Sequence, residues 1–369
     1  MSRPQNQTDN AKGSHKPTDS ATNHAPRIIS WNTTQNCNLK CAHCYINANN
    51  NEDKTELNTN EGKILIDQIA ELGRSILVLS GGEPLLRKDI FELASYGTKK
   101  GLIMTMGTNG TLIDSDAAKR IFDAGIRKVA ISIDSSTPQV HDELRGVKGA
   151  WNKAIEGVNS CIRNGVGVQF NVTTTRQNYN DLDNIFAMAN SLGVKSVHLF
   201  FLVPTGRGKN IIDISPKMYE DLLRKVLSNP RDTLEVKPTC APQFMRIAKE
   251  MNINMSRWSR GCIAGINYCR ILPDGSVTPC PYLPVKVGNI RQVQFKDIWA
   301  KSEVLNALRN FDNLKGKCGL CQHRSICGGC RARAYGITSY CGGTTVGNRE
   351  LKDTGDFLAE DPWCNYQPQ

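Results

Sequence analysis

Residues 36–45 read Asn-Cys-Asn-Leu-Lys-Cys-Ala-His-Cys-Tyr, and this stretch points to both a fold and a chemistry. Cys37, Cys41 and Cys44 follow an apolar run with the spacing C-x3-C-x2-C. Three thiolates on one loop can hold three irons of a four-iron cluster and leave the fourth iron open to another ligand. A zinc knuckle with His43 as its fourth ligand is the alternative. The position of the loop directly after a predicted strand favours the open, catalytic cluster.

The chain around this loop alternates between short apolar or β-branched runs and amphipathic stretches. The predicted strands are residues 27–34, 76–80, 103–108, 128–134, 168–175 and 196–203, and the helices between them are residues 59–73, 88–100, 115–125, 150–165 and 180–193. Such alternation implies parallel βαβ units. We therefore expect an α/β fold, a partial (β/α)6 barrel of the TIM-like type, with its chemistry at the C-terminal ends of the strands.

Composition divides the chain into three parts. Residues 1–26 are polar with almost no large apolar side chains, so we expect a disordered tail. Residues 27–235 carry the barrel pattern, which a helix over 217–227 would close. Residues 236–369 are rich in cysteine and turns, with one longer predicted helix over 295–309.

The bulk properties restrict the class of protein. The chain of 369 residues has 14 cysteines, no run apolar enough to span a membrane and no apolar signal segment, so we expect a cytoplasmic location with metal-binding thiols rather than disulfides. The formal net charge of +11 suits an anionic substrate or an acidic electron donor. A zinc-stabilised, nucleic-acid-binding protein is the alternative from another class. The scattered basic residues disfavour it.

The cysteine triad resembles that of the radical S-adenosylmethionine (SAM) superfamily. The resemblance implies that the amino and carboxylate groups of SAM chelate the open iron. One electron then cleaves SAM to methionine and a 5′-deoxyadenosyl radical, which takes a hydrogen atom from the substrate.

Several strand ends carry candidate SAM contacts. Gly81, Gly82 and Glu83 follow the second strand, where glycine lets the backbone approach a ligand and the carboxylate can accept from an ammonium. Alone they form a simple strand-to-helix turn, but they resemble the methionine-binding motif of the superfamily. The further candidates are Asn109, Ser132 and Asp134 for the ribose and Arg145 for the SAM carboxylate; turn capping and surface charge are the alternatives.

Nine cysteines lie between Cys262 and Cys364. They resemble the SPASM domain, which implies two auxiliary four-iron clusters, whereas two structural zinc ions are the alternative. Carried over by order, the first cluster would use Cys262, Cys269, Cys280 and Cys330, and the second Cys318, Cys321, Cys327 and either Cys364, which we prefer, or Cys341. Cys161 and Cys240 have no obvious cluster partners and are interpreted as buried structural residues.

Residues 28–34, 278–284, 327–335 and 354–364 narrow the resemblance to SPASM proteins that modify tetrapyrroles, although residues 340–351 depart from the usual tail. The resemblance implies oxidative decarboxylation of two propionates of Fe-coproporphyrin III to vinyl groups, as in SAM-dependent heme synthases, with reduced ferredoxin or flavodoxin as electron donor and without nucleic acid or membrane. Acetate removal from 12,18-didecarboxysiroheme by Fe-coproporphyrin III synthases, NirJ-type heme d1 chemistry and peptide maturation are alternatives. The candidates for holding substrate carboxylates are Arg207, Lys209, Arg331 and Arg333; His198 could ligate heme iron but fits a core histidine better.

Overall fold

One sheet of ten strands organises the molecule. The computed structural model describes residues 25–51, 54–211, 213–229, 233–255, 258, 260–339, 344–346, 349–351 and 355–368. The sheet has the order β10-β9-β8-β1-β2-β3-β4-β5-β6-β7. Its strands are β1 (Ile28–Asn32), β2 (Ile76–Ser80), β3 (Ile103–Thr108), β4 (Lys128–Ser132), β5 (Gly167–Thr174), β6 (Ser196–Phe201), β7 (Glu235–Thr239), β8 (Tyr268–Ile271), β9 (Ser276–Thr278) and β10 (Gly288–Asn289).

The strands from β1 to β6 pair in parallel and in chain order, which confirms the predicted α/β partial barrel. Two later strands extend this sheet at both edges. β7 pairs in parallel with β6, and β8 pairs in parallel with β1. The predicted boundary near residue 235 therefore falls at the start of a strand that belongs to the same sheet, and the division into two domains stays a prediction.

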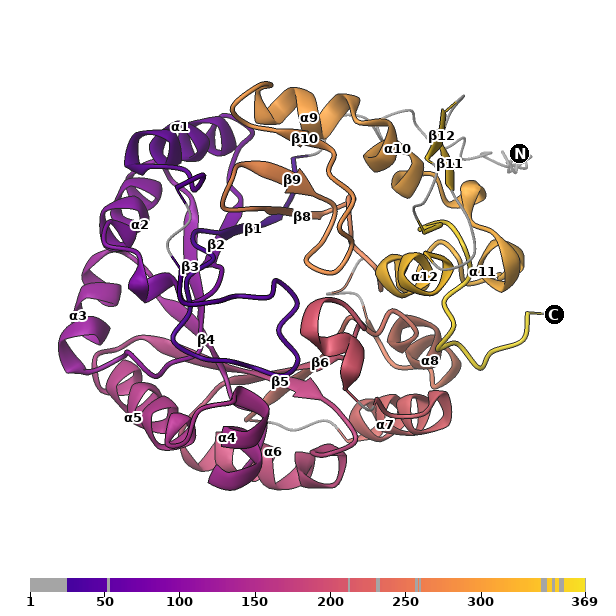
Figure 1. The fold of residues 1–369 in the computed structure, drawn as a ribbon. Coiled ribbons are helices and arrows are strands. Elements are labelled where there is room, and N and C mark those ends of the chain that lie inside the picture. Colours follow the sequence, from indigo (N-terminus) through magenta and orange to yellow (C-terminus); the bar gives the residue numbers. More distant parts are fainter. Residues whose placement is uncertain are drawn as a thin grey trace, which may run out of the picture.

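Helices cover the outside of the arc of strands (Figure 1). The helices that the sequence predicts in the barrel are α1 (Thr59–Ala70), α2 (Ile90–Lys99), α3 (Ser115–Asp123), α5 (Ala150–Arg163), α6 (Leu182–Ser191) and α7 (Pro216–Ser228). The sequence patterns did not reveal α4 (Pro138–Arg145), which lies between β4 and α5. Short 3-10 helices follow three of the strands: η1 (Pro84–Leu86), η2 (Tyr179–Asp181) and η3 (Gly206–Asn210).

The C-terminal part lies on the open side of the arc (Figure 1). Its elements are α8 (Phe244–Glu250), α9 (Phe295–Lys301), α10 (Glu303–Arg309), η4 (Phe311–Asn313), α11 (Gly316–Leu320), α12 (Arg331–Thr338) and the hairpin β11 (Thr344–Val346) and β12 (Arg349–Leu351). The single helix expected over 295–309 is two helices. Ser302 has extended backbone, and its side chain accepts from the amide of Leu305 to cap α10.

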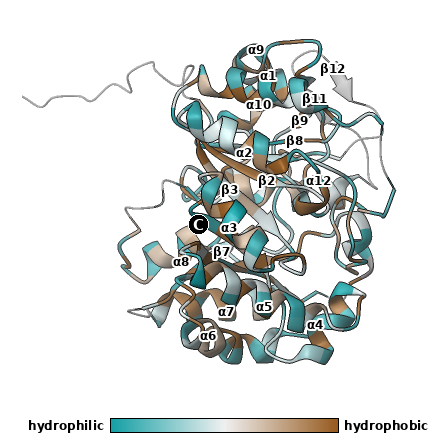
Figure 2. Ribbon diagram, turned by 90° about the vertical axis from the view of Figure 1, so that its left-hand side faces the viewer, coloured by the Kyte–Doolittle hydropathy of each residue, from teal (hydrophilic) through white to brown (hydrophobic). Residues whose placement is uncertain are grey.

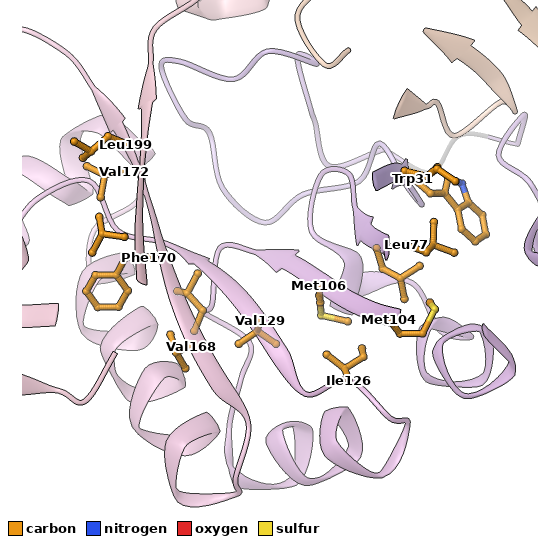
Figure 3. Close-up of a cluster of buried hydrophobic side chains, with 14 of the residues drawn as sticks. Trp31, Leu77, Met104, Met106, Ile126, Val129, Val168, Phe170, Val172 and Leu199 are labelled. Carbon is orange, nitrogen blue, oxygen red and sulfur yellow. The ribbon is translucent and has the colours of Figure 1, made fainter. Parts of the chain in front are cut away.

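Strand alternation separates an apolar from a polar face of the sheet. Trp31, Leu77, Val129, Phe170 and Leu199 pack toward the helices in the main core (Figure 3). Viewed from the side, brown strands lie beneath helices with teal stretches (Figure 2). No helix in the described part of the chain has the length and apolarity that a bilayer crossing requires.

The opposite face of the sheet lines the inside of the barrel. Ser132, Asn171, His198 and Lys237 occupy one row across β4 to β7, because each is the register partner of the next. The face of the sheet inside the barrel is therefore polar, whereas the outer face is apolar. The polar inner face is the side suited to ligands.

Candidate active site

The loop that carries the first three cysteines follows β1 and is fixed through its backbone. The amide of Cys37 donates to the carbonyl of Asn49 (2.8 Å), and that of Ala42 donates to the carbonyl of Leu144 at the end of α4 (2.9 Å). Arg207 lies inside the loop, where its Nε donates to the Cys41 carbonyl (2.8 Å) and its Nη1 to the Ala48 carbonyl (2.9 Å). The loop is thus held by α4 and η3 as well as by its own strand.

The sulfur atoms of this loop receive hydrogen bonds that suit thiolates. The amide of Leu39 donates to Cys37 Sγ (3.4 Å), the amide of Ala48 donates to Cys44 Sγ (3.4 Å), and Arg145 Nη1 donates to Cys41 Sγ (3.7 Å). Burial nevertheless raises the pKa of Cys37 to about 11, so a bound metal is needed to displace its proton at neutral pH. Soft sulfur donors with amide support are the environment that iron–sulfur clusters use, and the residues fit the expected cluster.

Arg145 joins the cysteine loop to the end of β4. Its Nη2 lies 2.7 Å from Asp134 Oδ2, and both side chains are buried. Burial opposes ionisation of Asp134, but Arg145 and the neighbouring histidines hold the pKa of that carboxyl below its ordinary value. As placed here, Arg145 and Asp134 satisfy each other, and their expected roles toward SAM stay predictions.

His43, the fourth ligand of the zinc alternative, pairs with Asp134 instead. Its Nε2 lies 3.5 Å from Asp134 Oδ2, and burial lowers the pKa of His43 to about 4, against the effect of that carboxylate. Tyr45 follows two residues later and packs against Tyr282 of the C-terminal part, with ring centroids 5.3 Å apart. The loop therefore contacts both halves of the molecule.

The glycine motif after β2 packs directly on the cysteine loop. A Cβ on Gly82 would lie 2.1 Å from the carbonyl oxygen of Asn36, and a Cβ on Gly81 would lie 2.4 Å from that of Thr34. The amide of Gly82 donates to the Thr34 carbonyl (2.8 Å), and the amide of Glu83 donates to the Asn36 carbonyl (2.8 Å). Gly81 and Gly82 therefore lack side chains mainly because the two loops contact each other so closely here.

Glu83 links this motif to the loop after β3. Its carboxylate accepts from Thr108 Oγ1 (2.8 Å) and from the amide of Asn109 (2.8 Å). Burial raises the pKa of Glu83 to about 7, against these hydrogen bonds. The carboxylate therefore positions the third loop here, and a contact with the SAM ammonium stays a prediction.

The other predicted contacts gather at the same end of the sheet. Asn109 Nδ2 donates to Asn38 Oδ1 (2.8 Å), which brings the β3 loop onto the cysteine loop. Ser132 ends β4 and faces the barrel interior with His198. Sequence reasoning missed Glu56, which accepts from Thr34 Oγ1 (2.9 Å) and the amide of Gln35 (2.6 Å), because no motif marks it.

Three of the four residues expected to hold substrate carboxylates have other partners, which corrects that expectation. Arg207 holds the cysteine loop, as described above. Arg331 is buried and donates to the carbonyls of Phe357 (3.1 Å) and Ala359 (2.7 Å). Arg333 is buried in an ion pair, and Lys209 alone of the four is exposed. The backbone carbonyls and carboxylates that bind these guanidinium groups could not be read from sequence order.

Four cysteines of the C-terminal part line one pocket: Cys318, Cys321, Cys327 and Cys364. The amide of Asp361 donates to Cys318 Sγ (3.4 Å) and that of His323 to Cys321 Sγ (3.4 Å). This set is the one expected for the second auxiliary cluster, with Cys364 as the preferred fourth member. Cys341 lies outside the described residues.

The first auxiliary set differs from the expectation at one position. Cys262 and Cys280 lie near Cys330, but Cys269 does not join them. Cys269 sits on β8 as the register partner of Ile29, fully buried in the core on the helix-facing side of the sheet. The structure therefore places Cys269 apart from the other thiols, because alternation along β8 directs its side chain to the helix-facing side.

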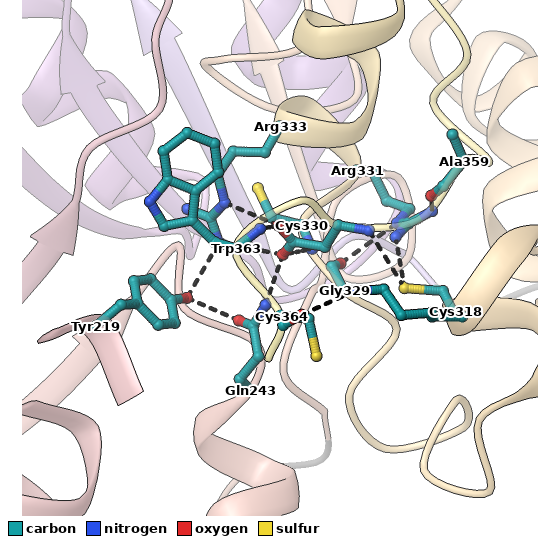
Figure 4. A network of polar contacts seen from close by, with 12 residues as sticks. Tyr219, Gln243, Cys318, Gly329, Cys330, Arg331, Arg333, Ala359, Trp363 and Cys364 are labelled. Carbon is teal, nitrogen blue, oxygen red and sulfur yellow. Dashed lines mark hydrogen bonds and ion pairs between the residues drawn. The ribbon is translucent and has the colours of Figure 1, made fainter. Parts of the chain in front are cut away.

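A buried polar network joins the segments that carry these cysteines (Figure 4). Arg333 Nε lies 3.1 Å from Asp361 Oδ1, and both side chains are fully buried. Asp361 Oδ2 also accepts from the amide of Cys330 (2.7 Å) and from Gln243 Nε2 (2.7 Å). Arg333 additionally donates to the hydroxyl of Tyr219 (3.0 Å). One carboxylate thus fixes α12, α8 and the C-terminal tail relative to α7.

Two family models match the chain. Residues 31–189 match the radical SAM superfamily, and residues 262–330 match an iron–sulfur cluster-binding domain, SPASM. These matches support SAM and four-iron clusters as cofactors, and they set the zinc alternatives aside.

Relatives along nearly the full length sharpen this result. The chain is 39% identical to the AdoMet-dependent heme synthase of Methanosarcina barkeri, over 94% of this chain and 99% of that protein. It is 32% identical to the Fe-coproporphyrin III synthase of the same organism, over 91% of this chain and 87% of that protein.

The fold has a solved counterpart. Streptococcus suis SuiB bound to S-adenosylmethionine superposes with a TM-score of 0.72 at 18% identity, covering 93% of this chain and 78% of SuiB. With the thiol loop, the strand-end motifs and the cysteine-rich C-terminal part, these likenesses show that the chain belongs to the radical SAM enzymes with a SPASM domain, in the group that includes the AdoMet-dependent heme synthases.

Proposed function

We propose that the protein is a radical SAM heme synthase, which converts two propionate side chains of Fe-coproporphyrin III to vinyl groups. The observation that carries this proposal is the 39% identity to an AdoMet-dependent heme synthase across almost all of both chains, against 32% to an Fe-coproporphyrin III synthase. The cysteine loop, the glycine motif and the C-terminal cysteines all lie within that matched length.

Cys37, Cys41 and Cys44 would hold the catalytic cluster, and the glycine motif and Asn109 lie where SAM would bind at the strand ends. When bound, the cluster and SAM supply one-electron abstraction of a hydrogen atom. The chain itself fixes the geometry. Arg145 holds Cys41 Sγ and Asp134, and Glu83 holds the β2 and β3 loops together.

The balance of the reaction gives the C-terminal part a role. Each propionate loses one hydrogen atom, carbon dioxide and one electron when it becomes a vinyl group, so an acceptor for that electron is needed. An auxiliary cluster held by the C-terminal thiols is such an acceptor. We propose a reduced ferredoxin or flavodoxin as the donor for SAM cleavage. The net charge of +11 supports an acidic partner.

The barrel interior carries positive charge that suits a substrate with several carboxylates. Lys237 lies on the interior face of β7 as the register partner of His198, whereas Lys128 is exposed at the N-terminal start of β4. Burial lowers the pKa of His198 to about 3, and the two lysine charges add to this effect. We propose that Lys237 helps to attract the propionate groups, in place of the arginines that serve structural contacts. His198 stays neutral beside this lysine.

The test is incubation of anaerobically reconstituted enzyme with SAM, a reductant and either Fe-coproporphyrin III or 12,18-didecarboxysiroheme. Heme b formed from the first substrate, with carbon dioxide and 5′-deoxyadenosine, is the expected result. Consumption of the second substrate alone would favour acetate removal. If SAM is cleaved while neither tetrapyrrole changes, the assignment to tetrapyrroles is wrong and the superfamily still holds.

We propose the cytoplasm as the place of action. All thirteen described cysteines are free thiols, as a reducing compartment maintains them. Fractionation of native cells with an antibody to the protein tests this location.

A further inference from the structure

Cys240 occupies an unusual backbone position directly after β7. Its φ is +57°, in the left-handed region that residues other than glycine, asparagine and aspartate rarely adopt. Such strained positions cluster at functional sites, where the surrounding structure holds a side chain in one direction. Family matching does not extend to this residue, because the SPASM match covers residues 262–330.

The strained residue is directed toward the first auxiliary set. Cys240, Cys280 and Cys330 pack together in one cluster of buried side chains with Leu283 and Val203. The thiols of Cys330, Cys280 and Cys262 all lie close enough to Cys240 to interact with it electrostatically.

Backbone contacts hold the four segments together. A Cβ on Gly261 would lie 2.5 Å from the carbonyl oxygen of Pro242, so the chain before Cys262 rests directly on the chain after Cys240. The amide of Cys262 donates to the carbonyl of Cys327 (3.1 Å), which ties this segment to the turn that ends at Cys330. Cys280 follows β9, and the carbonyl of the preceding Pro279 accepts from the amide of Gly265, three residues after Cys262 (3.1 Å). Thiols from four separate segments therefore converge.

Cys269 has the opposite environment. It packs among Ile29, Trp31 and Ile271 in the main core, on the helix-facing side of the sheet. Burial raises the pKa of Cys269, and Arg309 is the charged group that acts on it; no described thiol does. The adjacent Arg270 points to the other side, where Nη1 donates to the Pro281 carbonyl (2.8 Å) beside Cys280.

We propose that Cys240, Cys262, Cys280 and Cys330 hold the first auxiliary iron–sulfur cluster and that Cys269 is a core residue. Four thiols lose their protons on binding and close the site to further ligands, so this cluster serves electron transfer rather than substrate binding. The inference rests on the auxiliary clusters that the SPASM match implies and does not depend on the identity of the substrate.

The experiment counts iron in a chain that lacks the catalytic cluster. Cys37, Cys41 and Cys44 are replaced with alanine, so that iron bound after anaerobic reconstitution belongs to the C-terminal part. About eight irons per chain are expected in this background. Adding Cys240→Ala should lower the count to about four, or leave a cluster whose electron paramagnetic resonance spectrum changes on addition of imidazole. Adding Cys269→Ala should leave iron and spectrum unchanged.

Cys240→Ser keeps the test decisive if the alanine variant folds poorly. Serine can supply an oxygen ligand, so we expect retained iron with a shifted reduction potential and spectrum for one of two clusters. The proposal would be overturned if both Cys240 variants kept the iron content and the spectra of the parent variant, in which only Cys37, Cys41 and Cys44 are replaced. Loss of a cluster in the Cys269→Ala variant would overturn it as well. Heme formation is not measured, so a wrong substrate assignment cannot produce either outcome.

Discussion

The cysteine loop of the barrel and the cysteines of the C-terminal part achieve metal binding in different ways. In the barrel, three thiols lie within eight residues of one loop, from Cys37 to Cys44. The strand-end loops hold this segment mainly through backbone contacts. In the C-terminal part, thiols far apart in the chain meet around a buried ion pair between Arg333 and Asp361. We propose that the first arrangement leaves one coordination position of its cluster open and that the second closes its sites.

The comparison implies that the two regions can be disabled separately. Replacing Cys37, Cys41 and Cys44 with alanine should reduce 5′-deoxyadenosine formation to the level seen without enzyme, because no other site offers an open iron. Iron in the C-terminal part should remain. Chromatographic measurement of 5′-deoxyadenosine, with iron analysis of the same sample, checks both statements. SAM cleavage at the normal rate in this variant would contradict the assignment of the loop.

The C-terminal region should depend more strongly on one buried charge. Arg333→Met leaves Asp361 buried without its partner, so we expect a loss of about 3–5 kcal/mol in the free energy of unfolding. Urea titration followed by circular dichroism measures this change. The double variant Arg333→Met with Asp361→Asn should recover part of the loss. Equal destabilisation in the single and double variants would show that packing, not charge, dominates.

The barrel site should respond instead to a backbone displacement. Gly82→Ala places a methyl group against the Asn36 carbonyl, so one loop must move. We expect SAM cleavage to fall about 10- to 100-fold, as misplacement of a catalytic group does. Gly336→Ala in α12 is the matched control, because no atom lies within 4 Å of its added Cβ. Similar activities in the two variants would argue against the role of the close contact.

The smallest expected effect concerns pH at the barrel site. Burial lowers the pKa of His141 to about 4 from 6.5, and its Nδ1 accepts from the amide of Asp134 (3.1 Å). The unfolded chain therefore takes up this proton first as pH falls from 6.5 toward 4. Acidification should destabilise the fold by about 1 kcal/mol per pH unit through this group.

His141→Asn keeps an acceptor for the Asp134 amide and removes the titrating ring. Its unfolding free energy, measured by urea titration at pH 7, 6 and 5, should depend less steeply on pH than that of the unmodified chain. Parallel slopes for the two proteins would mean that His141 takes up its proton at the same pH in the folded and the unfolded chain.

Local sequence signals predicted the elements that set the site. Alternating apolar runs gave six strands within a few residues of their bounds, since strand periodicity and glycine helix ends are written locally. The short α4 was missed because its eight residues make only about two helical turns, yet it supplies Arg145. The helix over 295–309 was predicted as one because Ser302 breaks it through a cap, not through proline or glycine.

The sequence by itself determined the chemistry of this protein. Cysteine spacing on one loop and glycines after a strand are local, and their donor atoms restrict what they can bind. Only the tertiary structure decided which distant side chains meet. Order along the chain placed Cys269 with the cluster ligands and left Cys240 out, whereas alternation along β8 and the strained turn after β7 support our proposal that reverses both. The direction of a side chain depends on how strands pair, and pairing is a property of the whole sheet.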